Sequence, residues 1–94
     1  MLTNPDRLYI DGKWVPASSH RFIDVIAPAT EEIFLTVAEA NEADIDRAVD
    51  AARRAFDNGP WPRMTHAERA HYLNRIADAI DRRSDEIAAI WPNE

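Results

Sequence analysis

The spacing of apolar residues changes near residue 40, and this change constrains the fold more than any other feature of the chain. Before that point, short β-prone runs alternate with turn residues. After it, apolar residues recur every three or four positions, as they do on one face of a helix. The sequence therefore predicts strands and turns over residues 1–40, followed by helices over residues 41–94, with no repeat or linker between them.

The strand region begins with a predicted β-hairpin. In the segment Arg7–Val15, two short β-prone runs flank Asp11-Gly12, a pair that tolerates the positive φ angles of a two-residue hairpin turn. Two further extended runs, over residues 22–26 and 33–37, are separated by a turn that contains proline. We expect one hairpin followed by two more strands.

Capping residues mark where the helices begin. Asn41 is placed to cap a first helix, with Asp44 three residues later to return the hydrogen bond, and Gly59 lies where that helix should end. Thr65 opens a second helix with the full capping box Thr-His-Ala-Glu, and Ser84 can cap a third. Three helices are therefore expected.

Each predicted helix carries an apolar stripe, and the strand region is too short to cover three stripes. Some of this surface is therefore expected to face something that lies outside these 94 residues. The stripes are Ile45, Ala48, Val49, Ala52 and Phe56 in the first helix, Tyr72, Leu73, Ile76, Ala77 and Ile80 in the second, and Ile87, Ile90 and Trp91 in the third.

The sequence lacks several residue types and spacings on which catalytic, metal-binding and dinucleotide-binding sites depend. The chain has no cysteine, which excludes a thiolate zinc site and a cysteine nucleophile, and it has only two glycines, too few for a dinucleotide-binding fingerprint. His66 and His71 differ by five positions, which places them about 140° apart on a helix rather than in a metal-binding pair. We assign no catalytic and no cofactor-binding residue.

Charge and hydropathy narrow the partners and the location. The net charge is −6, with acidic and basic residues interspersed, which argues against a nucleic-acid partner. No stretch approaches the roughly 18 apolar residues that a spanning helix needs, and residues 1–7 lack the apolar core of a signal peptide. We expect no membrane partner and a cytoplasmic location.

Three segments, taken in order, resemble the N-terminal region of the aldehyde dehydrogenase superfamily. They are LYIDGKWV at residues 8–15, APATEEI at residues 27–33 and DIDRAVDAARRAF at residues 44–56, and the similarity continues through Trp61, Glu68-Arg69 and the apolar stripe of residues 73–80. The family usually has asparagine where Ala27 stands and glycine where Glu31 stands, and these departures loosen the subfamily assignment only.

The resemblance implies an α/β fold in which residues 1–94 form the N-terminal part of a cofactor-binding domain and no complete domain. It implies a parent protein several times longer, in which a later cysteine attacks the aldehyde, NAD or NADP takes the hydride, and a glutamate activates water to release the carboxylic acid. No catalytic or nucleotide-contacting residue of the family maps onto this segment. The implied role is therefore a scaffold, inactive by itself, whose partners are the rest of the parent polypeptide and, in the parent, further copies in a homo-oligomer.

The resemblance also implies a monovalent cation site. In some relatives such an ion is held by main-chain oxygens just before the proline of the second strand region and by an acid after the third helix, and these positions correspond to Val25, Ile26 and Glu94. Backbone carbonyls and a carboxylate are hard oxygen ligands suited to sodium or potassium.

A second class of protein stays open at this point. A stand-alone, noncatalytic interaction module derived from the family would keep the helices in order to bind another subunit. The reading frame beyond Glu94 discriminates the two, because a fragment of an enzyme requires a remainder that contains the cysteine.

Overall fold

The computed structural model describes residues 2–93 and begins with the expected hairpin. Strands β1 (Arg7–Ile10) and β2 (Lys13–Pro16) pair antiparallel. Asp11 and Gly12 form the turn with φ angles of 54° and 74°, as a two-residue turn of this hand requires. The hairpin prediction is confirmed.

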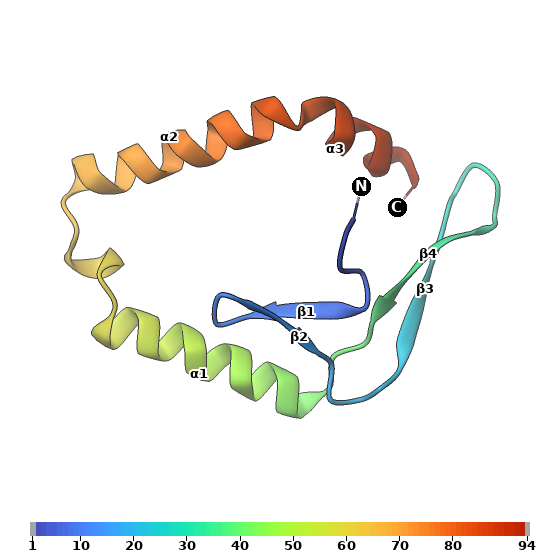
Figure 1. The fold of residues 1–94 in the computed structure, drawn as a ribbon, viewed down its shortest axis with the longest axis horizontal. Helices are drawn as coiled ribbons and strands as arrows, with labels where there is room; N and C mark the ends of the chain where they lie inside the picture. Colours follow the sequence, from blue (N-terminus) through green and yellow to red (C-terminus); the bar gives the residue numbers. More distant parts are fainter. Residues whose placement is uncertain (1, 94) are drawn as a thin grey trace.

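The second pair of strands forms a separate antiparallel sheet. Strands β3 (Phe22–Ile26) and β4 (Ile33–Ala38) pair in register until an irregularity between Val25 and Ile26. The connecting turn places Glu31 at a φ of 60°, in the left-handed region that favours glycine. The two hairpins are not hydrogen-bonded into one sheet, and Figure 1 shows them as separate arms.

Helix α1 (Glu42–Asn58) begins with the predicted capping box. The Asn41 side chain accepts from the Asp44 backbone N–H, and the Asp44 carboxylate accepts from the Asn41 backbone N–H. The helix ends before Gly59, as expected, but Gly59 has a φ of −80° and is not a left-handed cap. Glycine is needed there because a β-carbon would collide with the carbonyl oxygen of Ala55.

A short 3₁₀ helix, η1 (Trp61–Arg63), connects α1 to α2 (His66–Arg82). Helix α2 begins with the second predicted capping box, in which Thr65 Oγ1 accepts from the Glu68 N–H and Glu68 returns the interaction to the Thr65 N–H, both at 3.2 Å.

The prediction that Ser84 caps the third helix is wrong. Helix α3 (Ser84–Ile90) contains Ser84 as its first residue, and the preceding Arg83 makes no side-chain cap hydrogen bond. The physical reason is that α2 runs almost directly into α3, with the Arg83 N–H still donating to the carbonyls of Ile80 and Asp81. A 3₁₀ segment, η2 (Trp91–Asn93), follows.

The chain forms an open arc rather than a packed domain. In Figure 1, α1 and α2 lie on opposite sides of the ring and the hairpins lie between them and at one end. The radius of gyration is 16.7 Å, against about 12–13 Å for a compact domain of this length. Among residues 2–93, only Ala17, Ala27 and Asp44 are buried.

The apolar stripes of the helices are formed but uncovered. Eight of the larger stripe residues are between 39% and 62% exposed, and Trp91, which lies in η2, is 76% exposed. The eight are Ile45, Val49 and Phe56 in α1, Tyr72, Leu73, Ile76 and Ile80 in α2, and Ile87 in α3.

Candidate functional site

Asp44 is the one charged side chain that is buried among residues 2–93, with 1% of its surface exposed. Its carboxylate accepts from the Ser18 backbone N–H at 3.0 and 3.1 Å, from Ser18 Oγ at 2.8 Å and from the Asn41 N–H at 3.0 Å, and it is also paired with Arg47. These hydrogen bonds, foremost the one from the Asn41 backbone, hold the pKa of Asp44 well below its ordinary range and outweigh the opposing effect of burial. The carboxylate is therefore ionised and fully partnered.

This network fastens the loop after β2 to the first turn of α1. The sequence predicts the capping half of it, because Asn41 and Asp44 are three residues apart. The half that involves Ser18 is 26 residues away, and no periodicity in a single sequence links the two. Asp44 therefore has an architectural role, because its carboxylate is occupied by hydrogen bonds that join the loop to the helix.

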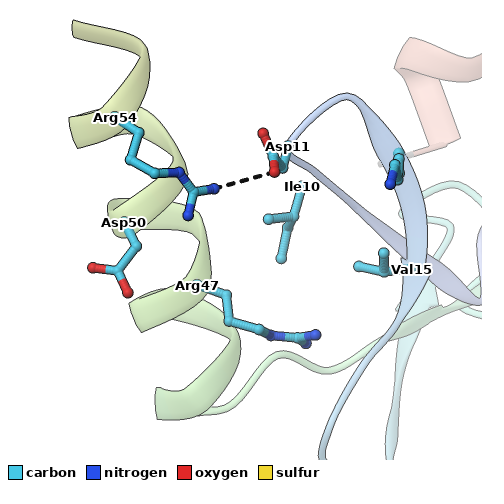
Figure 2. A pocket seen from close by; sticks show the side chains of 7 residues that line it. Ile10, Asp11, Val15, Arg47, Asp50 and Arg54 are labelled. Atoms are coloured by element: carbon cyan, nitrogen blue, oxygen red, sulfur yellow. Dashed lines mark hydrogen bonds and ion pairs between the residues drawn. The ribbon is translucent and has the colours of Figure 1, made fainter. Parts of the chain in front are cut away.

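A shallow cavity of about 290 Å³ lies between the β1–β2 hairpin and α1. Figure 2 shows Arg54 of α1 reaching across to Asp11 in the hairpin turn, with an Nη2 to Oδ2 distance of 3.1 Å. The other side chains on its wall are Ile10, Lys13, Val15, Arg47 and Asp50.

The lining of this cavity is typical of a surface contact between two elements. Its volume is at the low end of small-molecule pockets, its charges are of both signs, and its lining includes no serine, histidine or aromatic residue. Arg54 and Asp11 hold the hairpin tip against the helix, and both are more than half exposed, so their ion pair contributes little energy.

The residues of the expected cation site are only partly within the described structure. Val25 and Ile26 are the last two residues of β3 and flank the irregularity in its pairing. Glu94 lies outside the described residues. The site therefore stays a prediction. Within residues 2–93, no group of three or more acidic, histidine or cysteine side chains is placed to hold a metal ion.

The two helical histidines take part in separate surface contacts. A ring nitrogen of His66 lies 2.8 Å from Arg69 Nη2, and the His71 ring meets Tyr72 edge-on with centroids 5.8 Å apart. Both contacts are within α2, so they restrain the helix surface and bring together no residues that are distant in sequence.

The fold places the chain in a structural class, and the comparisons with known proteins give its family. Two hairpin sheets followed by three helices match the N-terminal part of an α/β domain. The model of the aldehyde dehydrogenase family matches residues 14–94. The chain belongs to the aldehyde dehydrogenase family.

Individual relatives are similar in both sequence and structure. Aldehyde dehydrogenase 1 from Tanacetum cinerariifolium is 49% identical over 84 residues. A Mycobacterium tuberculosis aldehyde dehydrogenase, solved in complex with NAD+, superposes with a TM-score of 0.86 at 42% identity and covers 90% of this chain. A betaine aldehyde dehydrogenase from Staphylococcus aureus, also solved with NAD+, gives a TM-score of 0.89 at 36% identity over 95% of the chain.

The chain spans a small share of these relatives. It covers 17% of the Tanacetum protein and 18% of each of the two bacterial structures. No helix within residues 2–93 is both long and apolar enough to cross a membrane.

Proposed function

We propose that these 94 residues are the N-terminal part of an NAD(P)-dependent aldehyde dehydrogenase that oxidises an aldehyde to a carboxylic acid, and that they serve it as a scaffold. The observation that carries the proposal is the combination of a family match along nearly the whole chain with apolar helix faces that residues 2–93 leave largely exposed. A family member whose helices expose this much apolar surface needs a partner surface to bury it.

The scaffold role follows from which parts of the chain are held together by contacts of their own and which parts expose apolar surface. The Asp44 network joins the loop after the first hairpin to α1, and the exposed Arg54–Asp11 pair adds a weaker contact at the hairpin tip, so this part is organised by polar contacts. The exposed faces of α1 and α2 are apolar, and their burial against the rest of the parent would contribute roughly 25 cal/mol per Å². We infer that the segment is assembled by its own polar contacts and is stabilised by docking.

The catalytic chemistry is proposed for the parent alone. NAD+ is named in the solved Mycobacterium tuberculosis and Staphylococcus aureus relatives, which supports NAD or NADP as the hydride acceptor of the parent. By the family resemblance, a cysteine and a glutamate outside these residues would attack the aldehyde and activate water. This chain has no cysteine, and we assign it no part in those steps.

Three further expectations are part of the proposal. The parent is a homo-oligomer, an expectation that rests on the family resemblance. It works in the cytoplasm, as expected from the sequence. Several relatives carry mitochondrial names, so cell fractionation decides between the two compartments. The carbonyls of Val25 and Ile26 with the Glu94 carboxylate bind a monovalent cation, which the irregular end of β3 supports because it perturbs the pairing there.

The deciding experiment is the intact mass of the natural product, together with the reading frame beyond Glu94. We expect a continuous reading frame several times longer than 94 residues, with a cysteine in the part beyond Glu94. We also expect the full-length protein to reduce NAD+ or NADP+ when it is given an aldehyde. The 94-residue chain by itself should show no aldehyde oxidation and no saturable NAD+ binding. A natural product that ends at Glu94 and binds another subunit would instead establish the noncatalytic interaction module.

A further inference from the structure

We propose that residues 59–65, which connect α1 to α2, form a rigid elbow that sets the angle between the two helices without a hydrophobic core. Helices in a small protein normally owe their mutual orientation to the apolar side chains packed between them. Here the apolar faces of both helices are exposed, yet the connecting segment is restrained from each end by specific local contacts. The inference concerns this elbow and is independent of any enzymatic activity.

Gly59 fixes the exit of the chain from α1. Its N–H donates to the carbonyl oxygen of Ala55 at 2.9 Å, so the last turn of the helix continues to this residue. The approach is so close that a β-carbon on Gly59 would overlap the same carbonyl group. Because the obstacle is backbone, it cannot move aside as a flexible side chain would. Any other residue at this position has to change the path of the chain.

Arg63 ties the 3₁₀ turn back onto the end of α1. Its guanidinium donates from Nη1 to the carbonyl oxygen of Gly59 at 2.5 Å and from Nη2 to the carbonyl oxygen of Asp57. The last carbonyls of a helix have no partner within the helix and carry the negative end of its dipole. One fork-shaped cation therefore binds a carbonyl in the last turn of α1 and the carbonyl of the residue that follows the helix, and it joins η1 to α1.

The other end of the elbow is joined to α2. The Trp61 ring meets Tyr72 edge-on, with centroids 6.1 Å apart and an interplanar angle of 63°, so η1 contacts the second turn of α2. Thr65 starts that helix through its capping box with Glu68. Prolines on either side of Trp61 further limit the backbone of the turn. The direction of α2 is therefore determined by local contacts between residues 57 and 72.

The elbow would hold α2 in a fixed orientation before its apolar face docks against the rest of the parent protein. A helix held at a fixed angle loses less conformational freedom when its apolar face is buried than a helix on a loose linker does. This consequence rests on the proposed function, in which the rest of the parent covers that face. The rigidity itself does not, and it can be measured on the chain alone.

The test is a distance measurement between α1 and α2. Because the chain has no cysteine, Asp46→Cys and Asp78→Cys introduce two specific spin-label sites on exposed positions of the two helices. Pulsed electron spin resonance, with the labelled chain diluted in excess unlabelled chain, should give one narrow distance distribution. A broad distribution in this otherwise unchanged chain would overturn the proposal.

Variants assign the rigidity to the elbow. Gly59→Ala should shift the mean distance, and Arg63→Ala should broaden the distribution. Arg63→Lys should restore part of the narrow distribution, because one ammonium can still reach a carbonyl. Arg82→Ala, which removes an exposed arginine from the other end of α2, is the matched control and should change nothing. Circular dichroism checks that each variant keeps its helices.

Two results would refute the assignment. If Arg63→Ala and Gly59→Ala both keep the narrow distribution of the parent sequence, the elbow does not set the angle. If Arg82→Ala broadens the distribution as much as Arg63→Ala does, the effect is a general loss of helix stability. Neither result bears on the reading frame beyond Glu94, so the failure of this inference and that of the proposed function are distinguishable.

Discussion

Asp44 shows at the scale of one residue how a charge can be buried in a chain that has almost no interior. It is shielded by groups that donate hydrogen bonds to it, including the Ser18 N–H and Oγ and the Asn41 N–H. A carboxylate with this many donors is stable in its ionised form. Its loss would leave several donors without an acceptor.

Asp44→Asn is therefore expected to loosen the contact between Ser18 and α1. Asparagine keeps the shape but offers one acceptor oxygen, and its own N–H groups would face the donors of Ser18 and Asn41. Amide hydrogen exchange at Ser18 and Asn41 should become roughly tenfold faster or more. Asp46→Asn, on the exposed side of the same helix, is the control. Unchanged protection in Asp44→Asn would show that the network is not holding the loop.

Glu31 is a residue with an unfavourable backbone conformation. Its φ of 60° lies where a side chain clashes with the backbone, at a cost of roughly 1–2 kcal/mol. Glu31→Gly is expected to gain up to about 1 kcal/mol of turn stability, after allowance for the greater freedom of glycine in the unfolded chain. The measurement is slower amide exchange at Ala27, whose N–H donates across the turn to the Glu32 carbonyl.

The neighbouring residue gives the matched comparison for the turn. Glu32 has no positive φ, so Glu32→Gly should destabilise the turn by about 0.5–1 kcal/mol. If both substitutions destabilise it equally, the left-handed conformation of Glu31 carries no cost in solution.

At the scale of elements, α2 and α3 differ in how they begin. Thr65→Ala is expected to cost about 1 kcal/mol of helix stability, because the first-turn N–H of Glu68 loses its acceptor. Ser84→Ala should change stability by no more than about 0.5 kcal/mol, since Ser84 lies inside the helix. Circular dichroism and amide exchange at Glu68 measure the difference. A larger loss in Ser84→Ala would restore Ser84 as a cap.

The junction between α2 and α3 should respond to pH through Glu86. The hydrogen bonds from the Arg83 guanidinium are the largest cause that lowers the pKa of Glu86 from 4.5 to about 2. Because the folded value lies below the ordinary one, the stabilisation is complete above pH 4.5 and is lost as the pH falls toward about 2.

Nuclear magnetic resonance of the Glu86 side chain should therefore show a midpoint near 2. Arg83→Gln should move that midpoint toward 4.5, and Arg82→Gln should leave it where it is. An identical midpoint in Arg83→Gln would exclude the guanidinium as the cause.

At the scale of the whole molecule, the main feature is the amount of apolar surface left exposed. A chain of 94 residues that forms an open arc buries little of the surface that normally drives folding. The isolated chain is therefore expected to unfold in a broad transition and to self-associate as its concentration rises, measured by calorimetry and sedimentation. A sharp transition of a monomer above about 60 °C would show that no partner surface is needed.

How much could be predicted from the sequence depended on the range of each interaction. The Asp11-Gly12 turn and the two capping boxes were correct because their hydrogen bonds span three residues or fewer, and residue type and spacing determine them. Ser84 was misplaced because serine favours both a cap and a first turn, and only the continuity of α2 with α3 selects between them.

The sequence by itself determined the order of strands and helices, the residues that begin α1 and α2, and the apolar stripes. These depend on backbone preference and periodicity, which are local properties. The tertiary structure alone decided that Asp44 is buried against Ser18 and that Gly59 is required by the carbonyl of Ala55. It also showed which stripe residues are exposed, where the sequence had indicated only that some of them would be. Each of these features depends on which atoms lie in contact in the folded chain. The type and spacing of residues in a single sequence do not determine those contacts.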